Sequence, residues 1–135
     1  MIRKTEIPKR TEFEFKKVLR GILANAEKKI YFERGGSYGC GTPDILIPDS
    51  CKIRVVCFVE VKTSITNCSL QRALGQCLWY NLHYKTATPL LCFPLKMQGS
   101  QSTGWLQWLS VFEKYGIKLI NETNILEVIN AIKCI

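Results

Sequence analysis

Three ionisable side chains stand out as groups that could do chemistry together. Asp44 opens an apolar run that ends at Pro48, and Glu60 and Lys62 stand near the end of a second apolar run that starts at Arg54. Two carboxylates supply the hard oxygen ligands that Mg²⁺ prefers, and a lysine beside them is suited to contact a phosphate. The residue types therefore indicate a divalent-metal site that handles a phosphate group.

These residues need two neighbouring strands to bring them together. Both apolar runs are short and rich in Val, Ile and Phe, which predicts a β-hairpin or two adjacent strands, joined by a turn over residues 48–52. Because side chains alternate along a strand, the second strand divides into two faces. We expect one face to carry Val56, Phe58, Glu60 and Lys62, and the other Val55, Cys57, Val59 and Val61.

An isolated Glu-x-Lys is common, and it more often forms a weak ion pair at a solvated strand end. Two neighbours favour the chemical interpretation here: a Gly-x-Pro-Asp strand start before it and a glutamine-bearing helix after it. A second Pro-Asp pair occurs at Pro48 and Asp49. We prefer Asp44 because it opens a strand, whereas a Pro-Asp-Ser turn is expected around Asp49 in any case.

A further carboxylate can come from the first predicted helix, which begins at Thr11 with Glu14 as its capping partner. At about 100° per residue, Glu12 lies roughly 50° from the centre of the apolar face and Glu14 roughly 100°. Glu12 is the better candidate for a carboxylate that faces the sheet. The alternative, that both are first-turn residues favoured by the helix dipole, fits equally well.

The remaining segments alternate between strand and helix patterns. We expect strands over 30–32, 90–93 and 117–120, and helices over 70–84 with Ser69 as cap, from Trp105 to a stop at Gly116, and over 124–133. We expect residues 1–10 to form a basic arm or a first extended piece. This order predicts a single α/β domain, residues 1–135, with a mixed central sheet flanked by helices.

The charge balance points to a polyanionic partner. Lys and Arg number 19 against 11 Asp and Glu in 135 residues, a net charge of +8, and the basic residues gather in the first third of the chain. Such an excess on a small domain is typical of nucleic-acid binding, and Lys16 is one candidate contact. Arg34 and Ser37 lie in a glycine-rich loop over 33–41, which suits phosphate contact. A flexible turn is an equally good interpretation of that loop.

Cysteine usage and hydropathy bear on the compartment. The seven cysteines are odd in number and form no Cys-x-x-Cys pair, so neither a zinc site nor a disulfide framework is indicated. Several fall inside apolar runs, where a thiol packs as a small hydrophobe. We expect a reducing, cytoplasmic protein without a signal peptide or a membrane partner.

Taken together, these motifs resemble the PD-(D/E)XK nuclease superfamily. The resemblance rests on Pro43-Asp44, on Glu60-Val61-Lys62 after a step of sixteen residues from Asp44, and on Gln76 and Tyr80, which match the Q-x-x-x-Y helix motif of RecB-type members. The glycine-rich loop before Asp44 is similar to that of archaeal Holliday-junction resolvases and VRR-NUC domains. Homing endonucleases and small restriction enzymes look alike at this level, and the resemblance covers about residues 11–95.

The resemblance implies a restriction-endonuclease-like core and hydrolysis of DNA phosphodiester bonds with Mg²⁺ or Mn²⁺. Asp44, Glu60 and the Val61 carbonyl would hold the metal, and Lys62 would orient or deprotonate the attacking water. Glu12 would complete the site from the first helix. Gln76 and Tyr80 would support the lysine and a phosphate from the next helix.

The subclass stays open at this level. Junction resolvase, homing or restriction endonuclease and RecB-like exonuclease all fit the motifs. Cutting two strands with one site per chain favours a homodimer or a higher symmetric assembly. The rival from another class is a catalytically inactive nucleic-acid-binding module on the same fold.

Overall fold

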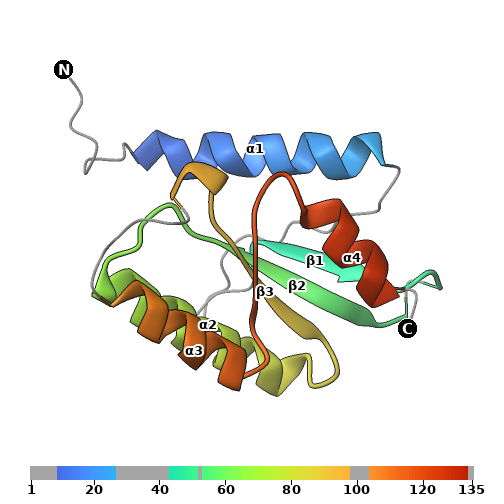
Figure 1. Cartoon of the computed structure of the whole chain (residues 1–135). Coiled ribbons are helices and arrows are strands. Elements are labelled where there is room, and N and C mark those ends of the chain that lie inside the picture. Colours follow the sequence, from blue (N-terminus) through green and yellow to red (C-terminus); the bar gives the residue numbers. More distant parts are fainter. Residues whose placement is uncertain (1–8, 27–42, 52, 98–103, 134–135) are drawn as a thin grey trace.

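A mixed β-sheet with strand order β1-β2-β3-β4 runs through the middle of the molecule (Figure 1). The computed structural model describes residues 9–26, 43–51, 53–97 and 104–133. The described elements, in chain order, are α1 (Lys9–Asn25), β1 (Ile45–Pro48), β2 (Val55–Val61), α2 (Asn67–His83), β3 (Thr88–Cys92), the 3-10 turn η1 (Leu95–Met97), α3 (Trp105–Lys114), β4 (Lys118–Ile120) and α4 (Ile125–Lys133). The α/β class predicted from the sequence is confirmed.

Some predictions fall outside the described residues, namely the strand over 30–32, the loop with Arg34 and Ser37, and most of the arm over 1–10. Within the described part, α1 begins at Lys9, two residues before the predicted start at Thr11, so the end of the predicted arm is helical. No helix in the described ranges is both long enough and apolar enough to cross a membrane.

The sheet is covered on both faces, which gives three layers. β1 and β2 form the predicted antiparallel hairpin, while β3 and β4 continue the sheet in parallel. Helices α1 and α4 cover one face and α2 and α3 cover the other (Figure 1). Apolar side chains on both faces explain why the inner strands read as nearly continuous hydrophobic runs.

The predicted alternation of β2 holds from Cys57 onwards but is wrong before it. Cys57, Val59 and Val61 pack with α1 and α4, whereas Phe58 packs with α2 and α3. Val56 packs with the first group and Val55 with the second, the reverse of the prediction. The cause is a β-bulge: Ile47 pairs with Cys57 but Pro48 pairs with Val55, so Val56 is an extra residue. A bulge residue reverses the side-chain alternation on the N-terminal side of the strand.

Helix α2 starts earlier than predicted, at Asn67, and its N-cap is Thr66 in place of Ser69. The Thr66 side chain accepts a hydrogen bond from the Ser69 backbone N–H at 3.2 Å. The Ser69 hydroxyl instead donates to the Ser64 carbonyl at 2.8 Å, which ties the loop after β2 to the helix. This bond matters for the site because that loop carries the residues directly after Lys62.

Three cysteines lie in the core, as their apolar neighbours predicted. Cys57, Cys77 and Cys92 are fully buried, and burial raises the pKa of all three, to about 12 for Cys57 and Cys77. A thiol with so high a pKa stays protonated and packs as a small hydrophobe. The core of the sheet therefore contains no reactive thiolate at these positions.

The closing helix α4 is held by an asparagine cap. The buried Asn121 side chain accepts hydrogen bonds from the backbone N–H groups of Thr123 at 2.9 Å and Asn124 at 3.2 Å. The Asn124 side chain in turn accepts from the Asn121 N–H at 2.9 Å. This reciprocal pair satisfies donors that a helix start would otherwise leave unpaired.

Asn121→Ala should therefore lower the free energy of unfolding by about 1–2 kcal/mol, because it removes a cap and leaves buried N–H groups without acceptors. Chemical denaturation monitored by circular dichroism measures the loss. The matched control is Asn130→Ala on the exposed face of α4, which should be neutral or slightly stabilising. Equal effects of the two changes would contradict the capping role.

Candidate functional site

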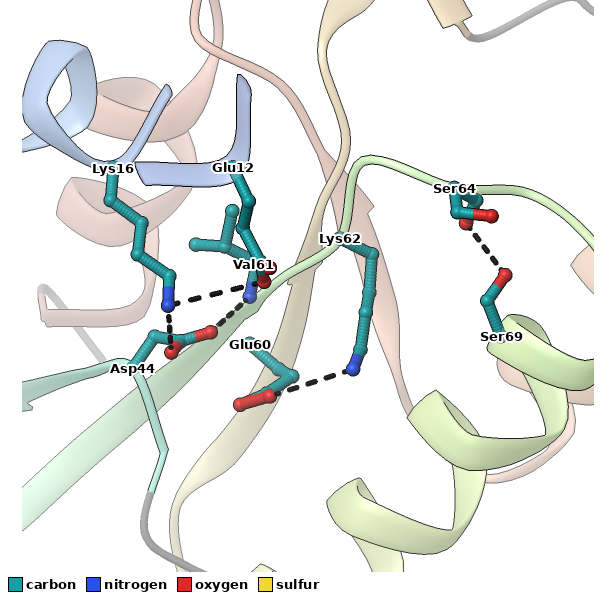
Figure 2. A network of polar contacts seen from close by, with 8 residues as sticks. All are labelled: Glu12, Lys16, Asp44, Glu60, Val61, Lys62, Ser64 and Ser69. Carbon is teal, nitrogen blue, oxygen red and sulfur yellow. Dashed lines mark hydrogen bonds and ion pairs between the residues drawn. The ribbon is translucent and has the colours of Figure 1, made fainter. Parts of the chain in front are cut away.

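The register of the β1–β2 hairpin places Asp44 beside the end of β2. Ile45 pairs with Val59, so Asp44, one residue earlier, falls opposite Glu60 in this antiparallel pair. The Val61 backbone N–H donates a hydrogen bond to Asp44 Oδ2 at 2.8 Å. The start of one strand and the end of the other are thus joined where the predicted chemical residues lie (Figure 2).

Glu60 lies on the β2 face that meets α2 and is only 4% exposed. Its Oε2 lies 3.9 Å from Lys62 Nζ, and the Lys62 side chain is 15% exposed. Glu60 Oε1 is buried and has no hydrogen-bond partner in the described part of the chain. A buried carboxylate oxygen without a donor is costly unless a proton or a cation occupies its lone pairs.

Helix α1 contributes a cation that the sequence did not place here. Lys16 Nζ lies 2.7 Å from Asp44 Oδ1 and 3.9 Å from Glu12 Oε1. Figure 2 shows Lys16 and Glu12 reaching down from α1 on one side of the end of β2, while Glu60 and Lys62 lie on the other. Glu12, one turn before Lys16, is half-buried, whereas Glu14 is exposed and faces away. The structure therefore places Glu12, rather than Glu14, at this end of the sheet.

The charges of this cluster shift two pKa values. Burial, together with the neighbouring Asp44 charge, raises the pKa of Glu60 to about 8, against the opposing pull of Lys62 and Lys16. For Lys16, burial lowers the pKa, but the hydrogen bond to Asp44 and the charges of Asp44, Glu12 and Glu60 outweigh it, so the pKa is raised. The raised pKa values mean that Glu60 resists ionisation and that Lys16 is a protonated ammonium.

Helix α2 closes the site on the opposite side. Gln76 is half-buried, and its Oε1 is buried without a hydrogen-bond partner among the described residues. Tyr80, one turn on, is 2% exposed and packs edge-to-face on Phe58 at 5.6 Å between ring centroids. In this arrangement Tyr80 belongs to the core and offers no surface to a DNA phosphate, which corrects its predicted role.

The donor set fits Mg²⁺ with few protein ligands. No group of three or more His, Cys, Asp or Glu able to hold a metal gathers in the described ranges. Mg²⁺ characteristically takes one or two carboxylates and keeps the rest of its shell for waters and phosphate oxygens. Asp44, Glu60 and the Val61 carbonyl match that requirement, and the unpartnered Glu60 Oε1 is a buried acceptor in need of a cation.

Asp49, the aspartate of the second Pro-Asp pair, has its side chain engaged in the hairpin turn. Asp49 Oδ1 accepts the Ile53 N–H at 2.9 Å, and Asp49 Oδ2 lies 4.0 Å from Arg54. The Asp49 N–H donates to the Arg54 carbonyl at 2.8 Å. Asp49 therefore stabilises the hairpin turn, at the opposite end of the strands from Glu60, as the sequence indicated.

Of the predicted site residues, Asp44, Glu60, Val61 and Lys62 are brought together with Glu12. Gln76 lies on α2 and makes no described contact with them. Arg34 and Ser37 lie outside the described residues. The contact between Lys16 and Asp44 was missed, although Lys16 lies one turn after Glu12 and so shares its side of α1. The four-residue spacing of Glu12 and Lys16 was therefore the sequence signal that could have placed Lys16 at this site.

The comparisons with known proteins add no relative. No protein-family model matches the chain, and neither a curated protein nor a solved structure does. Fold and site together define an α/β protein with a buried carboxylate–lysine cluster at a strand end.

Glu60 should make the stability of the protein fall as the pH rises. Its folded-state pKa, about 8, exceeds the ordinary 4.5, so the stabilising contribution is complete below about pH 4.5 and is lost as the pH rises through 8. Glu60→Gln cannot ionise and should avoid this loss, on the order of 5 kcal/mol in full. In metal-free buffer, its unfolding midpoint should exceed the wild-type midpoint by several degrees at about pH 9 and match it at about pH 5. A constant difference between these pH values would contradict the assignment.

Proposed function

We propose that this protein is a metal-dependent DNA phosphodiesterase, with Asp44, Glu60 and Lys62 as its catalytic centre. The observation that carries the proposal is the buried Glu60 carboxylate, which lies between Asp44 and Lys62 and has one oxygen without a partner in the described chain. Polar groups buried at such a cost are characteristic of functional sites. The proposal also draws on the motif resemblance of the sequence.

Asp44, Glu60 and the Val61 carbonyl would hold Mg²⁺ or Mn²⁺. When bound there, the ion would supply Lewis-acid stabilisation of charge on a phosphate and lower the pKa of an adjacent water. The hydrogen bond from the Val61 N–H fixes Asp44 Oδ2, so the carboxylate is oriented before any cation arrives. Such preorganisation avoids a reorientation cost during the reaction.

Lys62 is positioned to act on the attacking water or on the developing negative charge. Its Nζ stays within 3.9 Å of Glu60, and its side chain retains some solvent access. The Lys62 backbone N–H donates to the Cys92 carbonyl at 3.0 Å, which continues the ladder from β2 to β3 and fixes the position of its Cα. Gln76 Oε1 on α2 is buried and has no hydrogen-bond partner in the described chain, so we propose it as an acceptor for the lysine ammonium.

DNA is the proposed substrate because a net charge of +8 on 135 residues favours a polyanion. An endonuclease that recognises a DNA structure or a site is our first choice, and a RecB-like exonuclease is the alternative within the enzyme class. Cleavage of both strands by a chain with one site would require a homodimer or a higher assembly.

One observation favours a second candidate function, a catalytically inactive DNA-binding module. Lys16 Nζ lies 2.7 Å from Asp44 Oδ1, where it already neutralises one of the two proposed metal ligands. A domain that had replaced its metal by an internal ammonium would keep the fold and the basic surface without the chemistry.

Cleavage assays with Mg²⁺ on supercoiled plasmid, linear duplex, single strand and a four-way junction test the proposal. At least one substrate should be cut, and EDTA should abolish the cutting. Asp44→Asn and Lys62→Ala should each lower the rate by about 100-fold or more, because each removes a group that stabilises charge in the transition state. The substrate cut fastest would identify the subclass.

Asp49→Asn is the matched control, since it makes the same chemical change at the turn aspartate and should cut at the wild-type rate. Wild-type rates in the Asp44→Asn or Lys62→Ala protein would remove the proposed centre. DNA binding without cleavage of any substrate would establish the inactive module instead.

A further inference from the structure

Both oxygens of Asp44 are already engaged. Oδ2 accepts the Val61 N–H at 2.8 Å, and Oδ1 lies 2.7 Å from the Lys16 ammonium. The Asp44 side chain is only 18% exposed and that of Lys16 25%, so solvent screens this ion pair weakly. A divalent cation that binds Asp44 must therefore share Oδ2 with the Val61 N–H or share Oδ1 with the Lys16 ammonium, and at Oδ1 it meets a second positive charge.

Two positive groups cannot occupy that oxygen together without a large cost. A divalent ion at bonding distance from Asp44 Oδ1 would lie within about 5 Å of an ammonium that is 2.7 Å from the same atom. At such distances, in a partly buried site, the repulsion is several times the thermal energy. Lys16 and a divalent ion would therefore compete for Asp44 Oδ1.

Lys16 has a second acceptor within reach. Glu12 Oε1 lies 3.9 Å from Lys16 Nζ, one helical turn away, and the Glu12 side chain is 43% exposed. A lysine side chain has four rotatable carbons and exchanges between nearby partners with little backbone movement. The ammonium can therefore leave Asp44 and remain paired on α1.

We propose that Lys16 is an internal counter-cation that competes with the divalent metal for Asp44 and moves to Glu12 when the metal binds. This inference rests on the proposed metal site and deepens it. Lys16 is a positioning residue here: it keeps the metal-free carboxylate neutralised and sets the metal affinity. In this view Glu12 serves as the acceptor for the released lysine rather than as a metal ligand.

Isothermal titration calorimetry with Mn²⁺ and Mg²⁺, without DNA, tests the competition. Lys16→Gln should bind either ion with a dissociation constant about tenfold lower than the wild type, because it removes the competing charge. Lys17→Gln is the matched control: it loses the same charge one residue on, but Lys17 lies over the Phe13 ring at 4.9 Å and faces solvent. It should leave the affinity unchanged, and Lys16→Arg should resemble the wild type.

A second measurement on the wild type keeps the test decisive if Lys16→Gln fails to fold. Amine acetylation followed by peptide mass spectrometry reports the reactivity of Lys16 against Lys17. Mg²⁺ should raise the Lys16 reaction relative to Lys17, since the ammonium moves from a half-buried pair to an exposed one. Equal or weaker metal binding by Lys16→Gln, or for an unfolded variant an unchanged acetylation ratio, would overturn the proposal.

The two proposals fail in different ways. If Lys16→Gln binds metal more tightly than the wild type and neither protein cuts DNA, the proposal that Lys16 competes with the metal is supported and the proposed nuclease activity is refuted. If the wild type cuts DNA with Mg²⁺ but Lys16→Gln gains no affinity for the metal, the nuclease activity is supported and the competition between Lys16 and the metal is refuted.

Discussion

The hydrogen bond from the Val61 N–H to Asp44 Oδ2 is the contact on which the site depends. It joins the residue before β1 to the last residue of β2, just beyond the last ladder pair of the hairpin, Ile45 and Val59. A slip by one residue would move Ile45 and Ile47 to the face where Leu46 now packs, and Leu46 to theirs, so the packing of both core layers opposes a slip. The site is therefore maintained by the packing of Ile45 and Ile47 as much as by its own charges.

The two carboxylates near that hydrogen bond differ in how well they are paired. Lys16 pairs with Asp44, while Glu60 has only a 3.9 Å contact with Lys62 and one oxygen without a described partner. Without a cation, the raised pKa of Glu60 means that a proton takes this place near neutral pH. A divalent ion that displaces the proton would satisfy the same oxygen with a stronger interaction, so ion binding and proton release are linked. An acid whose burial costs free energy in the metal-free protein is more common at functional sites than elsewhere.

Much of this arrangement followed from local sequence signals. The hairpin, the preference for Asp44 over Asp49 and the joint direction of Glu60 and Lys62 rest on strand alternation and turn chemistry, which act over a few residues. The faces of Val55 and Val56 were wrong because a bulge opposite Pro48 depends on how the partner strand pairs. Helix α2 starts earlier than predicted because the N-cap is Thr66, whose side chain accepts the Ser69 backbone N–H. When two residues three positions apart can both cap the helix, the loop that precedes them decides which one does.

The sequence by itself determined the class of fold, the strand that carries Glu60 and ends directly before Lys62, and the positive character of the chain, since periodicity and composition are local properties. Only the tertiary structure decided that Lys16 pairs with Asp44, that Tyr80 is buried and that Glu60 Oε1 has no partner in the described chain. These three facts depend on the distances between α1, the sheet and α2. Helical phase restricts which side chains face the sheet, but only the packing of the layers decides which atoms meet.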